Sequence, residues 1–188
     1  KQVGNQVEGH LCIGFPWPSM ARTIWGDHQR YKETYFSAHK GYYFTGDSAY
    51  RDAVGYYRIT GHVDDVIIVS GHNLGTAPIE DAINEHPAVA ESAIVGVPHD
   101  IKGSALYGFV MLTDPGSTRV QDNLRKEINQ LVSDKIGPIA KLDYIQFVSA
   151  LPKTRSGKIM RRILRKVAHN EMDQLGDIST LINPESVE

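Results

Sequence analysis

The second half of the sequence alternates between strand-like and helix-like spacing of its apolar residues. Apolar residues dominate 89–97 and 106–112, and a shorter apolar stretch covers 144–148, so three strands are expected there. Between the second and third strands, apolar residues three or four positions apart predict an amphipathic helix over 121–135, which a Gly-Pro pair ends. Helices and strands in this order indicate an α+β domain with a short sheet flanked by helices.

Another helix is expected directly after a four-residue apolar run and two glycines. Thr76 suits its N-cap, and Glu80 and Asp81 suit the positive end of the helix dipole. Four side chains with helical spacing form its apolar face: Ile79, Ala82, Ile83 and His86.

The first 62 residues have a different organisation, with short strands and turns. Strands are expected over 7–13, over 42–45 and from residue 56 to Gly61, and a helix should begin at Asp27 and pack its aromatic side chains, Tyr31, Tyr35 and Phe36. This segment has too little apolar material for a self-sufficient domain. We therefore expect residues 1–63 to be the β-rich tail of a larger N-terminal domain, and residues 64–188 to form the small α+β domain.

Composition narrows the function classes only modestly. The 188 residues are 41% hydrophobic and carry a net charge of -2, which gives no general attraction to nucleic acid or membrane. No apolar run approaches the roughly 20 residues that a membrane span needs. Cys12 has no partner for an internal disulfide, which fits a reducing compartment such as the cytoplasm.

Two short segments carry residues suited to nucleotide chemistry. Asp47 follows a glycine at the end of a strand, so its two carboxylate oxygens can hold both hydroxyls of a ribose; taken alone, the same residue more often hydrogen-bonds its own turn. Lys158 follows a flexible Ser156–Gly157 pair, which can deliver its ammonium to a carboxylate and a phosphate.

Three stretches in this order resemble the AMP-forming acyl-CoA synthetases of the adenylate-forming superfamily. They are YYFTGDSAY at 42–50, ITGHVDDVIIVSGHNLGTAPIE at 59–80 and LPKTRSGKIMRRILRK at 151–166. With PWPSMARTIWGDHQRY near the start and LGDISTLINPESVE at the end, the sequence is most similar to the acetyl-CoA synthetases within that superfamily. The resemblance implies a C-terminal portion of such a ligase, converting acetate, ATP and coenzyme A into acetyl-CoA, AMP and pyrophosphate.

The resemblance also implies a role for individual residues. Asp47 matches the aspartate that binds the ribose of ATP and AMP, and Asp64 matches the hinge about which the small domain swings between two poses. Ser70 and Gly71 match the tunnel for the pantetheine arm of coenzyme A. Lys158 matches the catalytic lysine of adenylation, which is also the family's site of inactivating acetylation, so an acetyltransferase and a deacetylase are expected partners. Mg²⁺ should accompany ATP, but no metal ligands are evident in this sequence.

Three positions depart from the family pattern. His62 and Asn73 stand where arginines that contact the nucleotide are expected, and Ser133 stands where an arginine should meet a coenzyme A phosphate. Histidine is mostly neutral at pH 7 and asparagine always is, so fixed charges with forked donors are missing. Nucleotide and coenzyme A binding at these positions must differ from that of the family.

Other functions stay open at the level of sequence. The helix after Lys158 has a basic face, which also fits a binding module for an acidic partner or a degenerate, non-catalytic domain; its members are Arg161, Arg162, Arg165 and Lys166. A propionate-CoA ligase is a lesser alternative that stays open, because the resemblance places the acyl pocket upstream of residue 1. The same resemblance places the phosphate loop upstream, so we expect the separated chain to be inactive.

Overall fold

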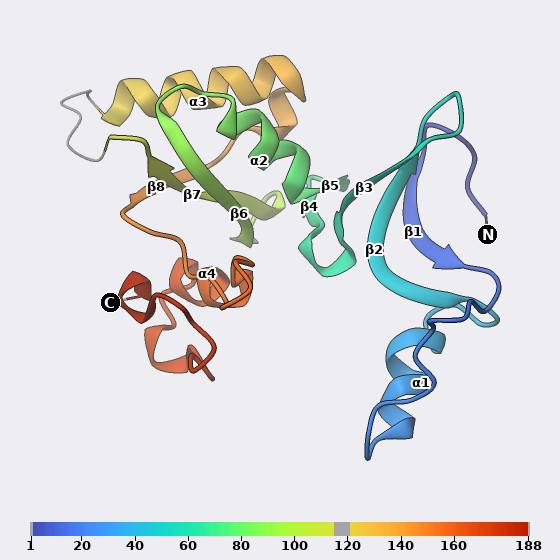
Figure 1. Ribbon diagram of the computed structural model, residues 1–188. Coiled ribbons are helices and arrows are strands. Elements are labelled where there is room, and N and C mark those ends of the chain that lie inside the picture. Colours follow the sequence, from blue (N-terminus) through green and yellow to red (C-terminus); the bar gives the residue numbers. More distant parts are fainter. Residues whose placement is uncertain (1, 115–120, 188) are drawn as a thin grey trace. The chain divides into compact units, whose positions relative to one another are not determined.

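The computed structural model describes residues 2–114 and 121–187. The chain divides into two compact units, Lys1–Val66 and Ile67–Glu188, which are described separately (Figure 1).

The first unit is a three-stranded antiparallel sheet, in the order β1-β2-β3, with one helix. Its elements are β1 (Glu8–Ile13), α1 (His28–Phe36), β2 (Tyr43–Arg51), β3 (Tyr57–His62) and a 3-10 turn, η1 (Val63–Asp65). The three expected strands and the helix are all present, and β2 continues beyond the predicted 42–45.

Helix α1 begins where its sequence predicts. The Asp27 carboxylate accepts a hydrogen bond from the backbone N–H of Arg30 at 2.9 Å, which satisfies one of the free donors of the first turn. The ring of Tyr31 is buried, and the ring of Tyr35 stacks on Tyr43 of β2 with centroids 4.8 Å apart. Aromatic packing therefore attaches the helix to the sheet.

The second unit holds a five-stranded sheet and three helices in the order that the sequence predicts. Strand β6 pairs along one edge of β7, and the other edge of β7 pairs with β4 at Gly103 and, in parallel, with β8. The elements are β4 (Ile67–Val69), β5 (His72–Leu74), α2 (Thr76–Asn84), β6 (Val89–His99), β7 (Gly103–Leu112), α3 (Gln121–Lys135), η2 (Pro138–Ala140), β8 (Tyr144–Val148), α4 (Arg161–Ala168), η3 (Met172–Gln174) and η4 (Pro184–Val187).

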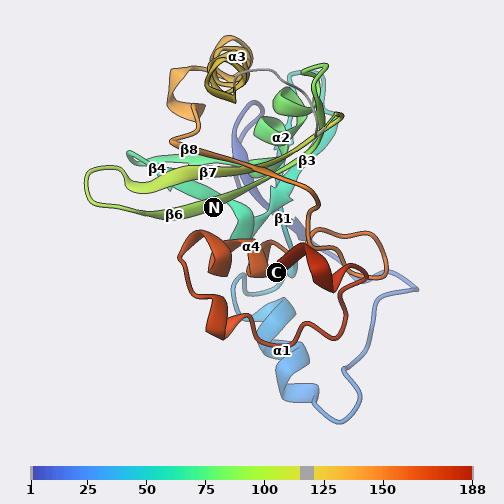
Figure 2. The ribbon, with the colours of Figure 1, turned by 90° about the vertical axis from the view of Figure 1, so that its left-hand side faces the viewer.

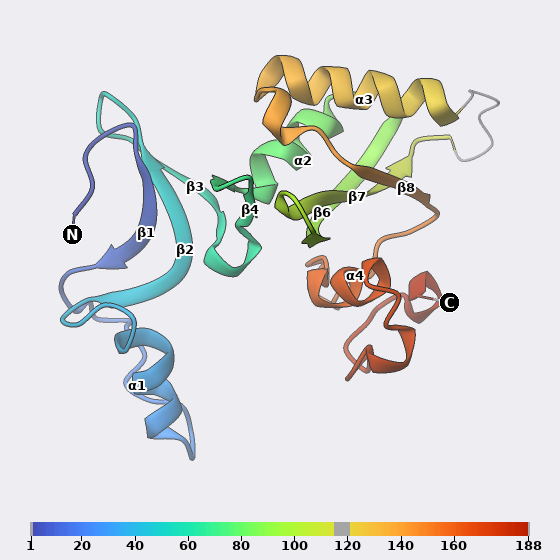
Figure 3. The same ribbon diagram turned by 180° about the vertical axis from the view of Figure 1, so that it is seen from behind.

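Helices cover both faces of this sheet, and each face has its own core. Helices α2 and α3 lie on one face and α4 lies on the other, as Figures 2 and 3 show. Ile83, Ile94 and Ile128 belong to the core under α2 and α3, whereas Phe109 and Leu164 belong to the core under α4. The expected fold class, α+β with a short sheet flanked by helices, is confirmed.

The expected start of helix α2 is wrong in detail. Gly75, in an extended conformation, is the N-cap, and Thr76 is the first helical residue, with only 2% of its surface exposed. The first turn therefore contains no acidic residue, and Glu80 is buried on the inner face. Thr76, Glu80 and Ile83 recur at helical spacing, so tertiary burial overrides the local preference for a polar cap.

No helix in the described part of the chain is long and apolar enough to cross a membrane.

Candidate functional site

Two of the predicted nucleotide-binding residues are in contact with each other. Asp47 on β2 and His62 on β3 are cross-strand partners, and Nδ1 of His62 lies 2.9 Å from Oδ1 of Asp47. The Asp47 side chain is 29% exposed and that of His62 is 62% exposed. Two hydroxyl groups that bind the Asp47 carboxylate would therefore also lie beside the imidazole of His62.

The backbone around Asp47 is set by a glycine and a threonine. Gly46 has a φ of +84°, in the left-handed region that glycine adopts readily. The Asp47 N–H donates to Oγ1 of Thr45 at 3.1 Å, and that hydroxyl donates to the carbonyl of Leu11 at 3.0 Å. Asp47 therefore lies within β2 and not at the end of a strand as expected, and its carboxylate contacts His62 on β3.

Asp64 lies in η1, two residues before the boundary between the units, and is exposed. Within this short turn, the N–H of Val66 donates to the carbonyl of Val63 at 3.4 Å. An exposed turn at the boundary between two separately packed units is a suitable place for a change in backbone angles.

Ser70 and Gly71 form the two-residue loop of the β4–β5 hairpin. Both have positive φ, 50° and 82°, which is the requirement of a type I′ turn. A Cβ added to Gly71 would meet nothing within 4 Å, so the glycine leaves open space beside the backbone. Asn73 is exposed on β5 opposite Ile68, and Ser133 is half-buried on α3.

Lys158 is exposed at the end of a tight loop. The loop closes through Thr154, whose N–H donates to the carbonyl of Lys158 at 2.8 Å and whose Oγ1 accepts from the N–H of Lys158 at 3.2 Å. Gly157 has a φ of +81°, and Lys153 pairs with Ile159 across the base of the loop. The ammonium is thus carried on an ordered base and faces solvent.

The basic residues of α4 are engaged within the chain. Arg161 binds Glu80, Arg162 donates to the carbonyls of Leu175 and Asp177, and Lys166 pairs with Glu171. The hydrogen bond from Lys166 holds the pKa of the Glu171 carboxyl below its ordinary value. These contacts engage most of the basic face within the chain, which counts against a free nucleic-acid surface.

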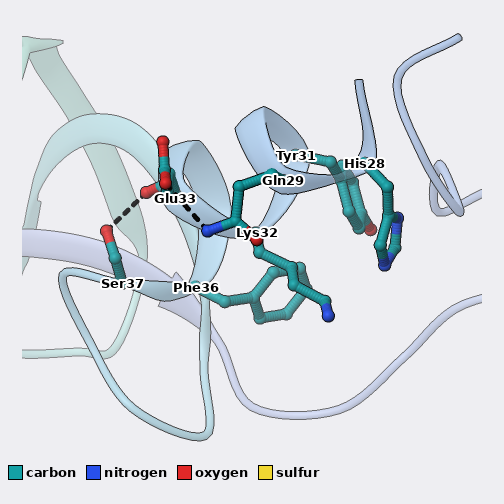
Figure 4. A pocket seen from close by; sticks show the side chains of 7 residues that line it. All are labelled: His28, Gln29, Tyr31, Lys32, Glu33, Phe36 and Ser37. Carbon is teal, nitrogen blue, oxygen red and sulfur yellow. Dashed lines mark hydrogen bonds between the residues drawn. The ribbon is translucent and has the colours of Figure 1, made fainter. Parts of the chain in front are cut away.

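A hollow beside α1 contains none of the predicted site residues. It is lined by residues that include His28, Tyr31 and Phe36, and Figure 4 shows these side chains along one side of the helix. Among the described residues, no group of three or more His, Cys, Asp or Glu side chains could hold a metal ion. The predicted site residues thus lie outside this hollow: His62, Asp64, Asn73 and Lys158 are exposed, whereas Asp47 and Ser133 are half-buried.

The predicted site residues do not form one cluster within the second unit. In the part of the chain that the structure describes, Lys158, Asn73 and Ser133 form no hydrogen bond with one another. Sequence reasoning missed the contact of Asp47 with His62 and the ion pair of Glu80 with Arg161. The sequence did contain a signal for the ion pair of Glu80 with Arg161. Glu80 lies on the same helical face as the apolar Ile83, and a carboxylate that is buried on such a face needs a partner.

Comparison with known proteins finds a matching family profile and curated relatives along the whole chain. The profile described as "AMP-binding enzyme C-terminal domain" matches residues 78–158. An acetyl-coenzyme A synthetase from Alkalilimnicola ehrlichii is 58% identical over all 188 residues, which correspond to 29% of that protein. The chain thus spans less than a third of the length of the curated relatives it matches.

Solved structures agree with the fold. Acetoacetyl-CoA synthetase from Streptomyces lividans superposes with a TM-score of 0.84 at 24% identity, over 99% of this chain and 28% of that one. ATP-bound MatB from Rhodopseudomonas palustris superposes with a TM-score of 0.74 at 25% identity, over 89% of this chain and 31% of that one. In sequence, this chain is similar to the C-terminal part of acetyl-coenzyme A synthetases, and its residues 78–158 match the AMP-binding enzyme C-terminal domain.

Proposed function

We propose that this chain is the C-terminal part of an AMP-forming acetate-CoA ligase. In the first half-reaction, acetate and ATP give acetyl-AMP and pyrophosphate; in the second, the thiol of coenzyme A takes the acetyl group and AMP leaves. The observation that carries the proposal is the 58% identity to acetyl-coenzyme A synthetase over the whole chain. The exposed Lys158 on its closed loop supports it.

The two units serve different parts of the reaction. Residues 1–63 complete the large N-terminal domain, where Asp47 holds the ribose of the nucleotide. Residues 64–188 form the mobile C-terminal domain, which turns about Asp64. In one pose Lys158 meets the carboxylate of acetate and the α-phosphate of ATP, where its charge orients and stabilises the transferring groups. In the other pose Ser70 and Gly71 border the path of the pantetheine arm.

His62, Asn73 and Ser133 give this ligase a different polar surface from the arginine-bearing pattern. His62 already contacts Asp47, so it can bridge the ribose-binding carboxylate and the bound nucleotide. Asn73 and Ser133 are neutral hydrogen-bonding groups at the positions expected to face the nucleotide and coenzyme A. Binding at these two positions therefore depends on hydrogen bonds instead of on fixed charge.

The same proposal includes the setting of the enzyme. Mg²⁺ enters with ATP, and the protein works in the cytoplasm, where acetate, ATP and coenzyme A are available. Because Lys158 is exposed, an acetyltransferase can reach it and a deacetylase can restore it. Acetylation removes the positive charge and would stop adenylation.

The two half-reactions measured separately test the role of Lys158. In the complete protein that contains this chain, Lys158→Ala should abolish acetate-dependent exchange between ATP and pyrophosphate. The same variant should still form acetyl-CoA from supplied acetyl-AMP and coenzyme A. Lys126→Ala, at an exposed position on α3, is the control and should change neither rate. Equal loss of both half-reactions in Lys158→Ala would contradict the assignment.

A further inference from the structure

Glu80 is a buried carboxylate that two partners hold from different directions. Its side chain is 10% exposed, and its Oε1 accepts a hydrogen bond from the backbone N–H of Ile94 at 2.8 Å. The guanidinium of Arg161 donates to both carboxylate oxygens, at 2.8 Å and 2.6 Å. Both hydrogen bonds come from Nη2 of Arg161, and this charge-assisted pair restrains the orientation of both side chains.

The position of Ile94 explains why a carboxylate is buried here. Among the strands that the structure describes, β6 is the last on its side of the sheet, so its outer N–H groups have no partner among these strands. Oε1 of Glu80 receives one of these groups. Helices α2 and α4 cover opposite faces of the sheet (Figure 1), and the ion pair of Glu80 with Arg161 joins these two helices.

The chain between Arg161 and Lys158 is short and closely tied to its neighbours. Arg161 is the first residue of α4, three positions after Lys158. In between, Ile159 pairs with Lys153, and the N–H of Met160 donates to the carbonyl of Pro152 at 2.8 Å. A displacement of Arg161 is therefore transmitted to the base of the Lys158 loop instead of being absorbed by slack.

We propose that Glu80 and Arg161 are positioning residues for Lys158. Their ion pair fixes the start of α4 against α2 and β6, and so fixes the direction in which the loop presents the ammonium. The inference rests on the proposed role of Lys158 in adenylation. It assigns no contact with substrate to either residue of the pair.

A pair that only stabilised the fold would affect both half-reactions alike, whereas a positioning pair affects only the half-reaction that uses Lys158. The variants are Glu80→Gln, which removes the charge and keeps the shape, and Arg161→Gln and Arg161→Lys, made in the complete protein. Glu85→Gln is the matched control, because Glu85 follows α2 directly and pairs with Lys135, far along the chain from the loop.

We expect Glu80→Gln and Arg161→Gln to lower kcat of acetate-dependent ATP–pyrophosphate exchange by about tenfold to 100-fold, since small misplacements of a reacting group have effects of this size. KM for ATP and the rate of acetyl-CoA formation from acetyl-AMP should stay at the parental values. Arg161→Lys should recover part of the lost rate, and Glu85→Gln should lose none.

Parallel loss of both half-reactions, or no loss of exchange, would overturn the proposal. If Glu80→Gln fails to fold, the same comparison between half-reactions is decided on Arg161→Lys, which keeps the charge. Failure of the proposed function itself is recognised separately, because then the parental protein shows no exchange or Lys158→Ala retains it.

Discussion

Asn183 fastens the C-terminal segment to residues 151–153, which lead into the Lys158 loop. Its Oδ1 accepts from the N–H of Lys153 at 3.0 Å, and its Nδ2 donates to the carbonyl of Leu151 at 2.9 Å. The next residue back, Ile182, donates its N–H to the carbonyl of Lys153 at 2.9 Å. Asn183→Ala should therefore loosen the segment locally without unfolding the unit.

The expected size of the effect follows from the two lost hydrogen bonds. Each contributes about 1 kcal/mol net, so the closed state should lose about 2 kcal/mol. Asn183→Ala also leaves the carbonyl of Leu151 without its side-chain donor. Leu151 is only 2% exposed, and an unsatisfied buried acceptor costs free energy, so the loss of stability should not be smaller than this estimate. At about 1.4 kcal/mol per factor of ten, local opening should become roughly 30-fold more frequent.

Amide hydrogen exchange of Lys153 in the complete protein measures this opening directly. Asn183→Ala should accelerate the exchange by roughly 30-fold, because the acceptor of that N–H is removed. Ser186→Ala is the matched control: its hydroxyl donates to the carbonyl of Asn183, so it lies in the same segment but does not contact Lys153. An unchanged Lys153 exchange rate in Asn183→Ala would refute this reasoning.

Two further predictions concern packing and pH. Gly108→Ala on β7 should destabilise the second unit by about 1–3 kcal/mol, because the new Cβ would lie 2.7 Å from Cδ2 of Leu142. Hydrogen exchange of the slowest β7 amides measures this loss of stability. Gly4→Ala is the control and should have no effect, because its new Cβ would meet nothing within 4 Å. A hydrogen bond from Lys166 lowers the pKa of Glu171 below its ordinary value of 4.5, and hydrogen bonds from Ser179 lower the pKa of Asp177 below its ordinary value of 3.8. The stabilisation that these contacts give the C-terminal segment is therefore present above the ordinary pKa values. It is lost as the pH falls through the lower pKa values of the folded state. Carboxyl titration by NMR should give folded-state midpoints below the ordinary values, and midpoints at or above them would be inconsistent with these contacts.

The periodic elements of the second unit could be predicted closely from the sequence. The helix over 121–135 and the strand over 144–148 have the predicted bounds. In both cases the apolar spacing is regular and ends at clear breakers, so local pattern and tertiary burial agree.

Contacts between distant residues could not be predicted in the same way. Thr76 and Glu80 carry local signals for a helix start, but their environment is set by β6 and by Arg161, which is 81 residues from Glu80 in sequence. Asp47 meets His62 because a register shift between Ser48 and Ala49 sets the pairing of β2 with β3. Such pairings depend on the assembled sheet and leave no local trace in the sequence.

The role expected of Gly71 lies between these two cases. Its positive φ and the open space beside it fit a narrow ligand path, but the same angles are already required by the two-residue hairpin.

Acetate-dependent exchange between ATP and pyrophosphate, by the complete protein with His62 and Asn73 in place, tests the proposed ligase most directly. We expect exchange that requires acetate and is lost in Lys158→Ala, which would establish adenylation without the two arginines. A folded protein that shows no exchange, and gains it when His62→Arg and Asn73→Arg are combined, would contradict the proposal and show that this member of the family has lost its activity.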